Sequence, residues 1–350
     1  MTGLKLAIDD AVDLAAVSAW LRTEGLGEGS IEDPQLLAGG TQNILLRLQI
    51  DGRSLVFRRP PLRPRPRNNE LILREATVLK ALAATSVPHA RLVAVCDDPS
   101  VLGSAVFYLM EAVDGFNPAE EVPEAFRSQH GREHLVYQAT DALAEIGSLD
   151  HEIIGLANFG KPQDFLERQV PRWVAERDKY LGMDGYDGTS LPHFEDIRDY
   201  LAATVPAAFR LGLMHGDYHL GNLIFEHRFG TLAAVLDWEM STIGDPLLDL
   251  GRYLATWPDQ HEVIMDAGGI WSAGELPSPE EVAARYCARS GRPDTDLRWY
   301  VVMGCFKLGI ILEGTYARSC AGLAPSAIGS ALHNAAVLLF ERAGRLSGVR

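Results

Sequence analysis

Three residues with oxygen-bearing side chains lie close together in the sequence. Asp217 belongs to the run HGDYHLGN, Asn222 ends that run, and Asp237 belongs to the run LDWE. One carboxylate and one amide oxygen are suitable ligands for Mg²⁺, a hard cation that completes its coordination shell with water and phosphate. We therefore expect Asn222 and Asp237 to hold Mg²⁺ and Asp217 to accept a proton from an attacking hydroxyl group.

The spacing of these residues places them at one end of a predicted β-hairpin. Leu223–Phe225 and Leu232–Leu236 are apolar, and a short glycine-containing turn separates them. In an antiparallel hairpin, residues equidistant from the centre of the turn lie opposite each other. Asn222 and Asp237 are equidistant from a point inside this turn, so we expect them side by side. Asp217 lies in the loop that leads into the same end of the hairpin.

These motifs resemble those of the aminoglycoside phosphotransferase family, which is related to the protein kinases. The similarity rests on the run from His215 to Asn222, on LDWE around Asp237 and on GDPLLDL, which contains Asp249. The resemblance implies that Asp217 is the catalytic base and that His215 supports the catalytic loop. It also implies that Asn222 and Asp237 bind Mg²⁺ and that Asp249 braces the loop.

Under the same resemblance, the N-terminal third of the chain contains the nucleotide contacts. The segment LAGGTQN lies between two candidate strands, where the family has a loop that covers the phosphates; a plain turn is the alternative. Glycines at such a place let backbone N–H groups approach phosphate oxygens. The residues that we expect to contact nucleotide here are Gly39, Gly40, Thr41 and Asn43.

A basic residue and an acidic partner follow this segment. Arg58 stands where protein kinases carry a phosphate-binding lysine. Arginine can bind phosphate through two N–H groups, although the exchange with lysine is not conservative. Glu75, in a predicted helix, matches the acidic partner of that residue, and a solvent-facing glutamate is the alternative interpretation.

The segment FYLMEAVDG resembles the family's hinge, where backbone groups bond adenine. We expect these backbone bonds from Glu111 and Val113. The side chains expected to line the adenine pocket are Met110, Ile224 and Leu236.

The elements predicted around these residues fall into two groups. Before residue 115, we expect helices at 10–25 and 69–84 and strands at 43–50, 54–58, 91–96 and 106–110, with Asp51-Gly52 as a hairpin turn. After it, helical periodicity predominates at 130–150, 163–182, 193–210, 245–256, 279–290 and in pieces of 296–340. The prediction is an α+β, two-lobed protein-kinase-like fold, with a small β-rich N-lobe at 1–112 and a large, mainly helical C-lobe at 113–350.

Composition excludes several classes of protein. The formal net charge of −15 is unfavourable for a nucleic-acid binder and leans slightly toward a cationic acceptor, although solubility alone explains it. The four cysteines have no zinc-like spacing with histidine, and the N-terminus has no signal-like segment. The longest apolar stretch, Val301–Leu312, is broken by Lys307 and is shorter than the ~20 residues of a membrane span. We expect a cytoplasmic protein without a membrane partner.

The resemblance thus implies a kinase that transfers the γ-phosphoryl group of ATP, or of GTP, to a hydroxyl group of a small molecule. The form of LDWE and GDPLLDL is similar to that of the branch attached to acyl-CoA dehydrogenases, so a metabolite such as a hydroxyacyl compound is the alternative acceptor. A non-catalytic nucleotide-binding scaffold and an ATPase without an acceptor are the alternatives. Residues that could reach an acceptor, or simply pack, are Arg172, Trp173, His219, Glu239, Glu313 and Tyr316.

Overall fold

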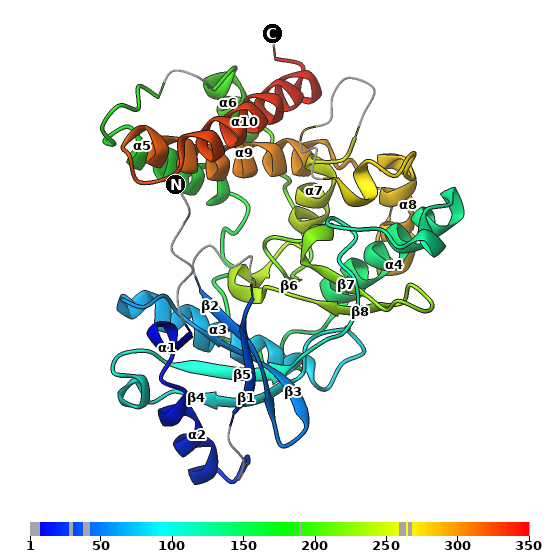
Figure 1. Ribbon diagram of the computed structural model, residues 1–350. Coiled ribbons are helices and arrows are strands. Elements are labelled where there is room, and N and C mark those ends of the chain that lie inside the picture. Colours follow the sequence, from blue (N-terminus) through cyan, green and yellow to red (C-terminus); the bar gives the residue numbers. More distant parts are fainter. Residues whose placement is uncertain are drawn as a thin grey trace. The chain divides into compact units, whose positions relative to one another are not determined.

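The computed structural model describes residues 8–27, 31–37, 43–188, 191–258, 264, 268–293 and 295–349. The chain forms two compact units, whose elements are drawn in Figure 1. Unit 1 comprises Met1–Gly115 and Ala233–Glu239, and unit 2 comprises Phe116–Leu232 and Met240–Arg350. Unit 1 contains a five-stranded sheet and unit 2 contains most of the helices, in agreement with the predicted α+β organisation.

Unit 1 is built on an antiparallel sheet with the strand order β1-β2-β3-β5-β4. Asp51 and Gly52 both have positive φ angles, 50° and 75°, which the predicted two-residue turn between β2 and β3 requires. The strands are β1 (Glu32–Leu36), β2 (Ile44–Ile50), β3 (Arg53–Arg59), β4 (Leu92–Cys96) and β5 (Phe107–Glu111), and the helices are α1 (Ile8–Ala11), α2 (Leu14–Thr23) and α3 (Pro66–Leu82).

The two faces of this sheet differ because side chains alternate along β3. Phe57 lies in a buried apolar cluster with residues of α1 and α2. The next residue, Arg58, points to the other face and pairs with Glu75 of α3. A single helix was predicted where α1 and α2 are found. The division arises where Asp13 caps α2 by accepting a hydrogen bond from the Ala16 N–H.

Unit 2 is mainly helical, and α9 and α10 lie side by side in it (Figure 1). Strands β6 (Gly212–Met214) and β9 (Thr242–Gly244) pair antiparallel, β7 is Leu223–Phe225, and β8 (Leu232–Val235) begins at the boundary with unit 1. The helices are α4 (Gln129–Ser148), α5 (Gln169–Tyr180), α6 (Phe194–Ala203), α7 (Leu247–Ala255), α8 (Pro279–Ser290), α9 (Arg298–Cys320) and α10 (Ser326–Ser347). Short 3₁₀ turns are η1 (Pro99–Leu102), η2 (Glu124–Phe126), η3 (Leu220–Asn222), η4 (Trp238–Met240) and η5 (Gly269–Trp271).

Local signals explain where the helices of unit 2 begin and end. α8 occupies the predicted range because Ser278 and Glu281 form a capping box around Pro279 at the first helical position. α6 ends at Ala203, before the predicted residue 210. Pro206 follows two residues after its C-cap and disfavours helical geometry in the residue before it.

Among the described residues, α9 has a length and composition that would also suit a membrane span. In this fold 72% of the most apolar stretch of α9 is buried. It packs against α5, α7 and α10. Such burial is typical of a core helix, so the composition of α9 carries no membrane assignment.

Candidate active site

The loop that carries Asp217 follows β6 in unit 2 and is fixed through its backbone. The carboxylate of Asp249, 1% exposed in α7, accepts hydrogen bonds from the N–H groups of His215 at 2.6 Å and Gly216 at 2.9 Å. Burial raises the pKa of Asp249, while His215, Lys307 and these two donors oppose the shift. Asp249 thus makes the bracing contact that the sequence predicted.

Glycine is required at position 216 for two reasons. Its φ angle is +88°, in the region that favours glycine, and a Cβ atom there would lie 2.3 Å from the carbonyl oxygen of Met240. The carbonyl oxygen of Gly216 accepts a hydrogen bond from the ammonium of Lys307. That ammonium also lies 5.5 Å from the ring centre of Trp173, in α5. Hydrogen bonds to Asp249 and Lys307 thus fix the peptide groups on both sides of Gly216, the residue before Asp217.

The carboxylate of Asp217, 32% exposed, faces basic groups. Arg252 donates to its Oδ1 from Nε at 3.1 Å and from Nη2 at 3.0 Å, and His219 Nε2 lies 3.7 Å from its Oδ2. Burial alone would raise the pKa of Asp217, but Arg252, His219 and Lys307 together hold it well below its usual range. Such a carboxylate stays ionised at neutral pH. It can orient a hydroxyl group, and it can accept the proton late, when the hydroxyl has begun to lose it.

Two more predicted residues contact the backbone beside Asp217. The amide nitrogen of Asn222 donates to the Asp217 carbonyl at 3.0 Å, which leaves the amide oxygen as the atom that could hold a metal ion. The fully buried ring of His215 accepts a hydrogen bond from the Asp217 N–H through Nδ1 at 3.3 Å. These contacts fit the supporting role expected of His215.

In unit 1, Arg58 is surrounded by carboxylates. Its Nε lies 2.9 Å from Glu75 Oε2, which is the predicted ion pair. Its Nη2 donates to Asp237 Oδ1 at 2.8 Å and to Glu239 Oε2 at 3.1 Å. Asn43 donates to the same Glu239 oxygen at 2.9 Å. Part of the guanidinium that was expected to face phosphate is therefore engaged by the protein's own acids.

The charges of this cluster favour a further cation. One arginine faces three carboxylates, two of which, Asp237 and Glu239, keep exposed fractions of 37% and 25%. Burial raises the pKa of Glu239, and Asp237 adds to the shift while Arg58 opposes it. Burial also raises the pKa of Glu75 to about 7 against the effect of Arg58. The donor set suits Mg²⁺, which takes few protein ligands.

The residues of the predicted metal site are divided between the two units. Asp217 and Asn222 lie in unit 2, and Asp237 lies in unit 1, so their predicted convergence stays a prediction. Among the described residues, no group of three or more His, Cys, Asp and Glu side chains is arranged to hold a metal ion alone. A site that needs phosphate oxygens to complete its shell would not form such a group.

Only some of the predicted nucleotide-contacting residues lie among the described residues. Gly39, Gly40 and Thr41 lie outside the described residues. At the hinge, the N–H of Glu111 donates to the Arg91 carbonyl at 2.9 Å. The Glu111 carbonyl and the backbone groups of Val113 thus remain as the predicted adenine contacts. Met110 is 9% exposed in β5, whereas Ile224 of unit 2 and Leu236 of unit 1 are half-buried.

Two residues beside Asp217 were missed from the sequence. Arg252 follows Asp249 by three positions, which places both on one side of α7, and this spacing could have indicated it. Lys307 interrupts an apolar run, but the sequence did not indicate that its charge acts on Asp217. Together with His219, both contribute to lowering the pKa of Asp217.

Glu313, which could have reached an acceptor or simply packed, pairs with other residues inside the helical core. It is fully buried, Tyr186 donates to its Oε1 at 2.8 Å, and His333 Nδ1 lies 2.7 Å from its Oε2. The ring of Tyr316 stacks on His333 with centres 4.3 Å apart. Because Glu313 is fully buried and has a partner on each oxygen, its carboxylate does not face solvent, from which a cationic acceptor would approach.

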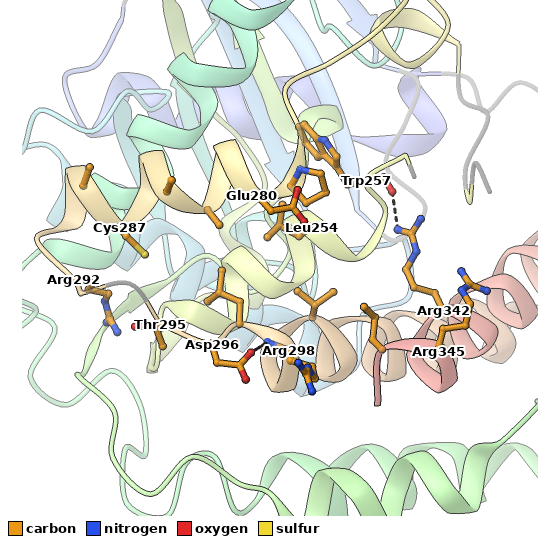
Figure 2. A pocket seen from close by; sticks show the side chains of 17 residues that line it. Leu254, Trp257, Glu280, Cys287, Arg292, Thr295, Asp296, Arg298, Arg342 and Arg345 are labelled. Atoms are coloured by element: carbon orange, nitrogen blue, oxygen red, sulfur yellow. Dashed lines mark hydrogen bonds between the residues drawn. The ribbon is translucent and has the colours of Figure 1, made fainter. Parts of the chain in front are cut away.

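A cavity of about 1070 Å³ lies elsewhere in unit 2, between α7, α8, α9 and α10 (Figure 2). Leu254, Trp257 and Cys287 contribute to its apolar walls, and Arg342 donates to the Trp257 carbonyl at 2.7 Å beside it. None of the predicted site residues lines this cavity. The predicted site residues thus lie elsewhere, around Asp217 in unit 2 and around Arg58 in unit 1.

Comparisons with known proteins identify the family of the chain. A family model described as "Phosphotransferase enzyme family" matches residues 33–299. Acyl-CoA dehydrogenase family member 10 of Mus musculus is 31% identical over 294 residues, which are 82% of this chain and 27% of that protein. The chain thus spans about a quarter of the length of this curated relative.

Solved structures are similar over almost the whole chain. A candidate aminoglycoside phosphotransferase from Ralstonia eutropha JMP134 is 29% identical, with a TM-score of 0.77, over 96% of this chain and 98% of that chain. A complex of aminoglycoside phosphotransferase APH(4)-Ia with AMP-PNP and hygromycin B is 17% identical, with a TM-score of 0.58, over 91% and 98%. The second likeness supports the fold alone. Together these structures confirm the predicted two-lobed, kinase-like fold.

Proposed function

Since the chain belongs to the phosphotransferase enzyme family, we propose that it transfers the γ-phosphoryl group of ATP, or of GTP, to a hydroxyl group of a small molecule with Mg²⁺. The observation that carries the proposal is the Asp217 carboxylate, which basic neighbours keep ionised on a loop that Asp249 fixes. The amide oxygen of Asn222 and the carboxylate of Asp237 would hold the metal ion.

The proposed reaction is an in-line displacement. The acceptor oxygen forms a bond to the γ-phosphorus, the bond from that phosphorus to the β–γ bridging oxygen breaks, and ADP or GDP leaves. The hydroxyl proton passes to Asp217. Asp217 mainly orients the hydroxyl group before this, because its low pKa makes it a weak base. Mg²⁺ neutralises phosphate charge when it is bound.

The acceptor is proposed from two sources. The structural neighbour at 29% identity, a candidate aminoglycoside phosphotransferase, supports an aminoglycoside as the acceptor. The likeness to an acyl-CoA dehydrogenase family member supports a hydroxyacyl compound as the alternative. The complete burial of Glu313 weakens the case for a cationic acceptor, because that carboxylate already pairs with Tyr186 and His333 away from solvent.

ADP or GDP release with Mg-ATP and Mg-GTP tests the proposal across a panel of aminoglycosides, amino alcohols, sugars and hydroxyacyl-CoAs. We expect release that requires one acceptor class and disappears in Asp217→Ala, while nucleotide binding persists. Asp217→Asn is the matched variant, since it keeps the size of the side chain and removes its charge. Equal turnover in the wild type and in both variants would refute the role of Asp217.

A non-catalytic nucleotide-binding scaffold is the second candidate. It is favoured by the contacts of Arg58 with Asp237 and Glu239, which compete with phosphate for the guanidinium. Nucleotide binding without ADP or GDP release in the presence of any acceptor would support the scaffold. ADP release that no acceptor increases would instead indicate an ATPase.

A further inference from the structure

Lys307 is a charged residue in an unusual place. It interrupts the apolar run of α9, a helix whose most apolar stretch is 72% buried. A buried ammonium costs desolvation free energy that a neutral side chain of similar length would not. Such a residue therefore needs partners that compensate for its charge.

Lys307 has compensating partners on three neighbouring elements. From the catalytic loop, the Gly216 carbonyl accepts its hydrogen bond and Asp217 contributes negative charge. From α7, Asp249 attracts the ammonium and Arg252 repels it.

From α5, the ring of Trp173 lies beside the ammonium, and Arg172 adds a second repulsion. The ammonium is thus placed where the catalytic loop meets three helices, α5, α7 and α9. All of these residues belong to unit 2.

We propose that Lys307 is a positioning residue of the catalytic loop, whose ammonium fixes the Gly216 carbonyl and balances the charges of Asp217 and Asp249. The N–H of Gly216 is held by Asp249 and its carbonyl by Lys307, so the peptide groups on both sides of this residue are fixed. The direction of the Asp217 side chain follows from that orientation. The catalytic consequence rests on the proposed function; the structural one does not.

The pH dependence of Lys307 gives the inference a distinctive signature. Burial lowers the pKa of Lys307 to about 8, with Asp217 and Asp249 opposing the shift and Arg252 and Arg172 adding to it. The ammonium therefore loses its proton slightly above neutral pH, where an arginine at the same position would remain charged. A role in packing alone would show no such transition.

Amide hydrogen exchange of His215 and Gly216, corrected for the intrinsic rate at each pH, tests this directly. At pH 7 we expect exchange about tenfold or more faster in Lys307→Met, which keeps the length and loses the charge, than in the wild type. Lys307→Arg should stay within about threefold of the wild type. The exchange is expected through a local opening of the loop that leaves Lys307 packed in α9, so loss of its proton weakens the contact with Gly216. In the wild type, protection should therefore fall between pH 7 and pH 9.5, and in Lys307→Arg it should not.

Two outcomes would overturn the inference. One is equal loop protection at pH 7 in the wild type and Lys307→Met, with unchanged exchange in α8 as the control for the fold. The other is protection in the wild type that does not change between pH 7 and pH 9.5. Neither measurement needs turnover, so a failure here is distinguishable from a failure of the proposed kinase activity, which Asp217→Ala tests separately.

Discussion

Arg252 directs two guanidinium nitrogens, Nε at 3.1 Å and Nη2 at 3.0 Å, to the same oxygen of Asp217, Oδ1. The other oxygen, Oδ2, has His219 at 3.7 Å, which is too long for a hydrogen bond. The two oxygens therefore differ in availability. Oδ2 is the atom that an acceptor hydroxyl group would reach.

Replacing Arg252 with Met should raise the pKa of Asp217 toward its ordinary value, because the strongest opposing charge is removed. The acid limb of the pH profile for nucleotide-dependent ADP release should then move to higher pH, and kcat should fall by about 100-fold as the carboxylate loses its orientation. Arg252→Lys keeps the charge and should retain the acid limb of the wild type. Identical acid limbs in the wild type and Arg252→Met would contradict the assignment.

Replacing Asp237 with Ala should lower Mg²⁺-dependent affinity for ADP by about 10- to 100-fold, because a ligand of the proposed metal site is lost. The fold of unit 1 should persist, because Arg58 keeps its ion pair with Glu75, in which Arg58 Nε lies 2.9 Å from Glu75 Oε2. Calorimetric titration with ADP, with and without Mg²⁺, measures the effect. An affinity that responds neither to Mg²⁺ nor to the substitution would rule out the metal role.

Replacing Gly216 with Ala should lower the free energy of unfolding by about 2–4 kcal/mol and abolish turnover. The added Cβ would meet the Met240 carbonyl at 2.3 Å in a backbone that already has a positive φ angle. Gly322→Ala is the matched control: its φ angle is +72° and the space around it is open. That control should cost only about 1–2 kcal/mol, the strain of the backbone conformation alone. Urea unfolding of both variants separates the two terms, and equal losses would contradict the steric argument.

The free energy of unfolding of the wild type should rise between about pH 8 and pH 10 relative to Lys307→Met. The folded pKa of Lys307 is about 8, below its ordinary value of 10.5, so the unfolded chain binds a proton that the folded chain has released. Stability therefore increases with pH in this window, by at most about 3 kcal/mol. Urea unfolding at several pH values gives the difference, in which tyrosine titrations cancel. Parallel curves for the two proteins would show that folding does not lower the pKa of Lys307.

The elements that local signals determine were predictable from the sequence. The Asp51-Gly52 turn and the capping box around Pro279 both act within a few residues, and both fixed the neighbouring elements as expected. The ion pair of Arg58 and Glu75 was predicted from the resemblance and has the expected geometry.

The contacts that were missed are those that packing creates between distant segments. Lys307 meets Gly216 across 91 positions, and Glu313 meets Tyr186 across 127. Periodicity places each residue on a helix but does not state which face meets which loop. For this reason the loop's charge environment, which keeps Asp217 ionised, emerged only from the fold.

The chain enters unit 1 twice, since Ala233–Glu239 belongs to it together with Met1–Gly115. A gene fragment that ends after Gly115 would encode the sheet and Arg58 but would lack Asp237 and Glu239, two of the acids that Arg58 contacts. Recombination between relatives at that boundary would combine an arginine from one parent with carboxylates from the other. Exchange of unit 1 as one contiguous cassette is thus unfavourable, and the coding sequence is expected to be inherited as a whole.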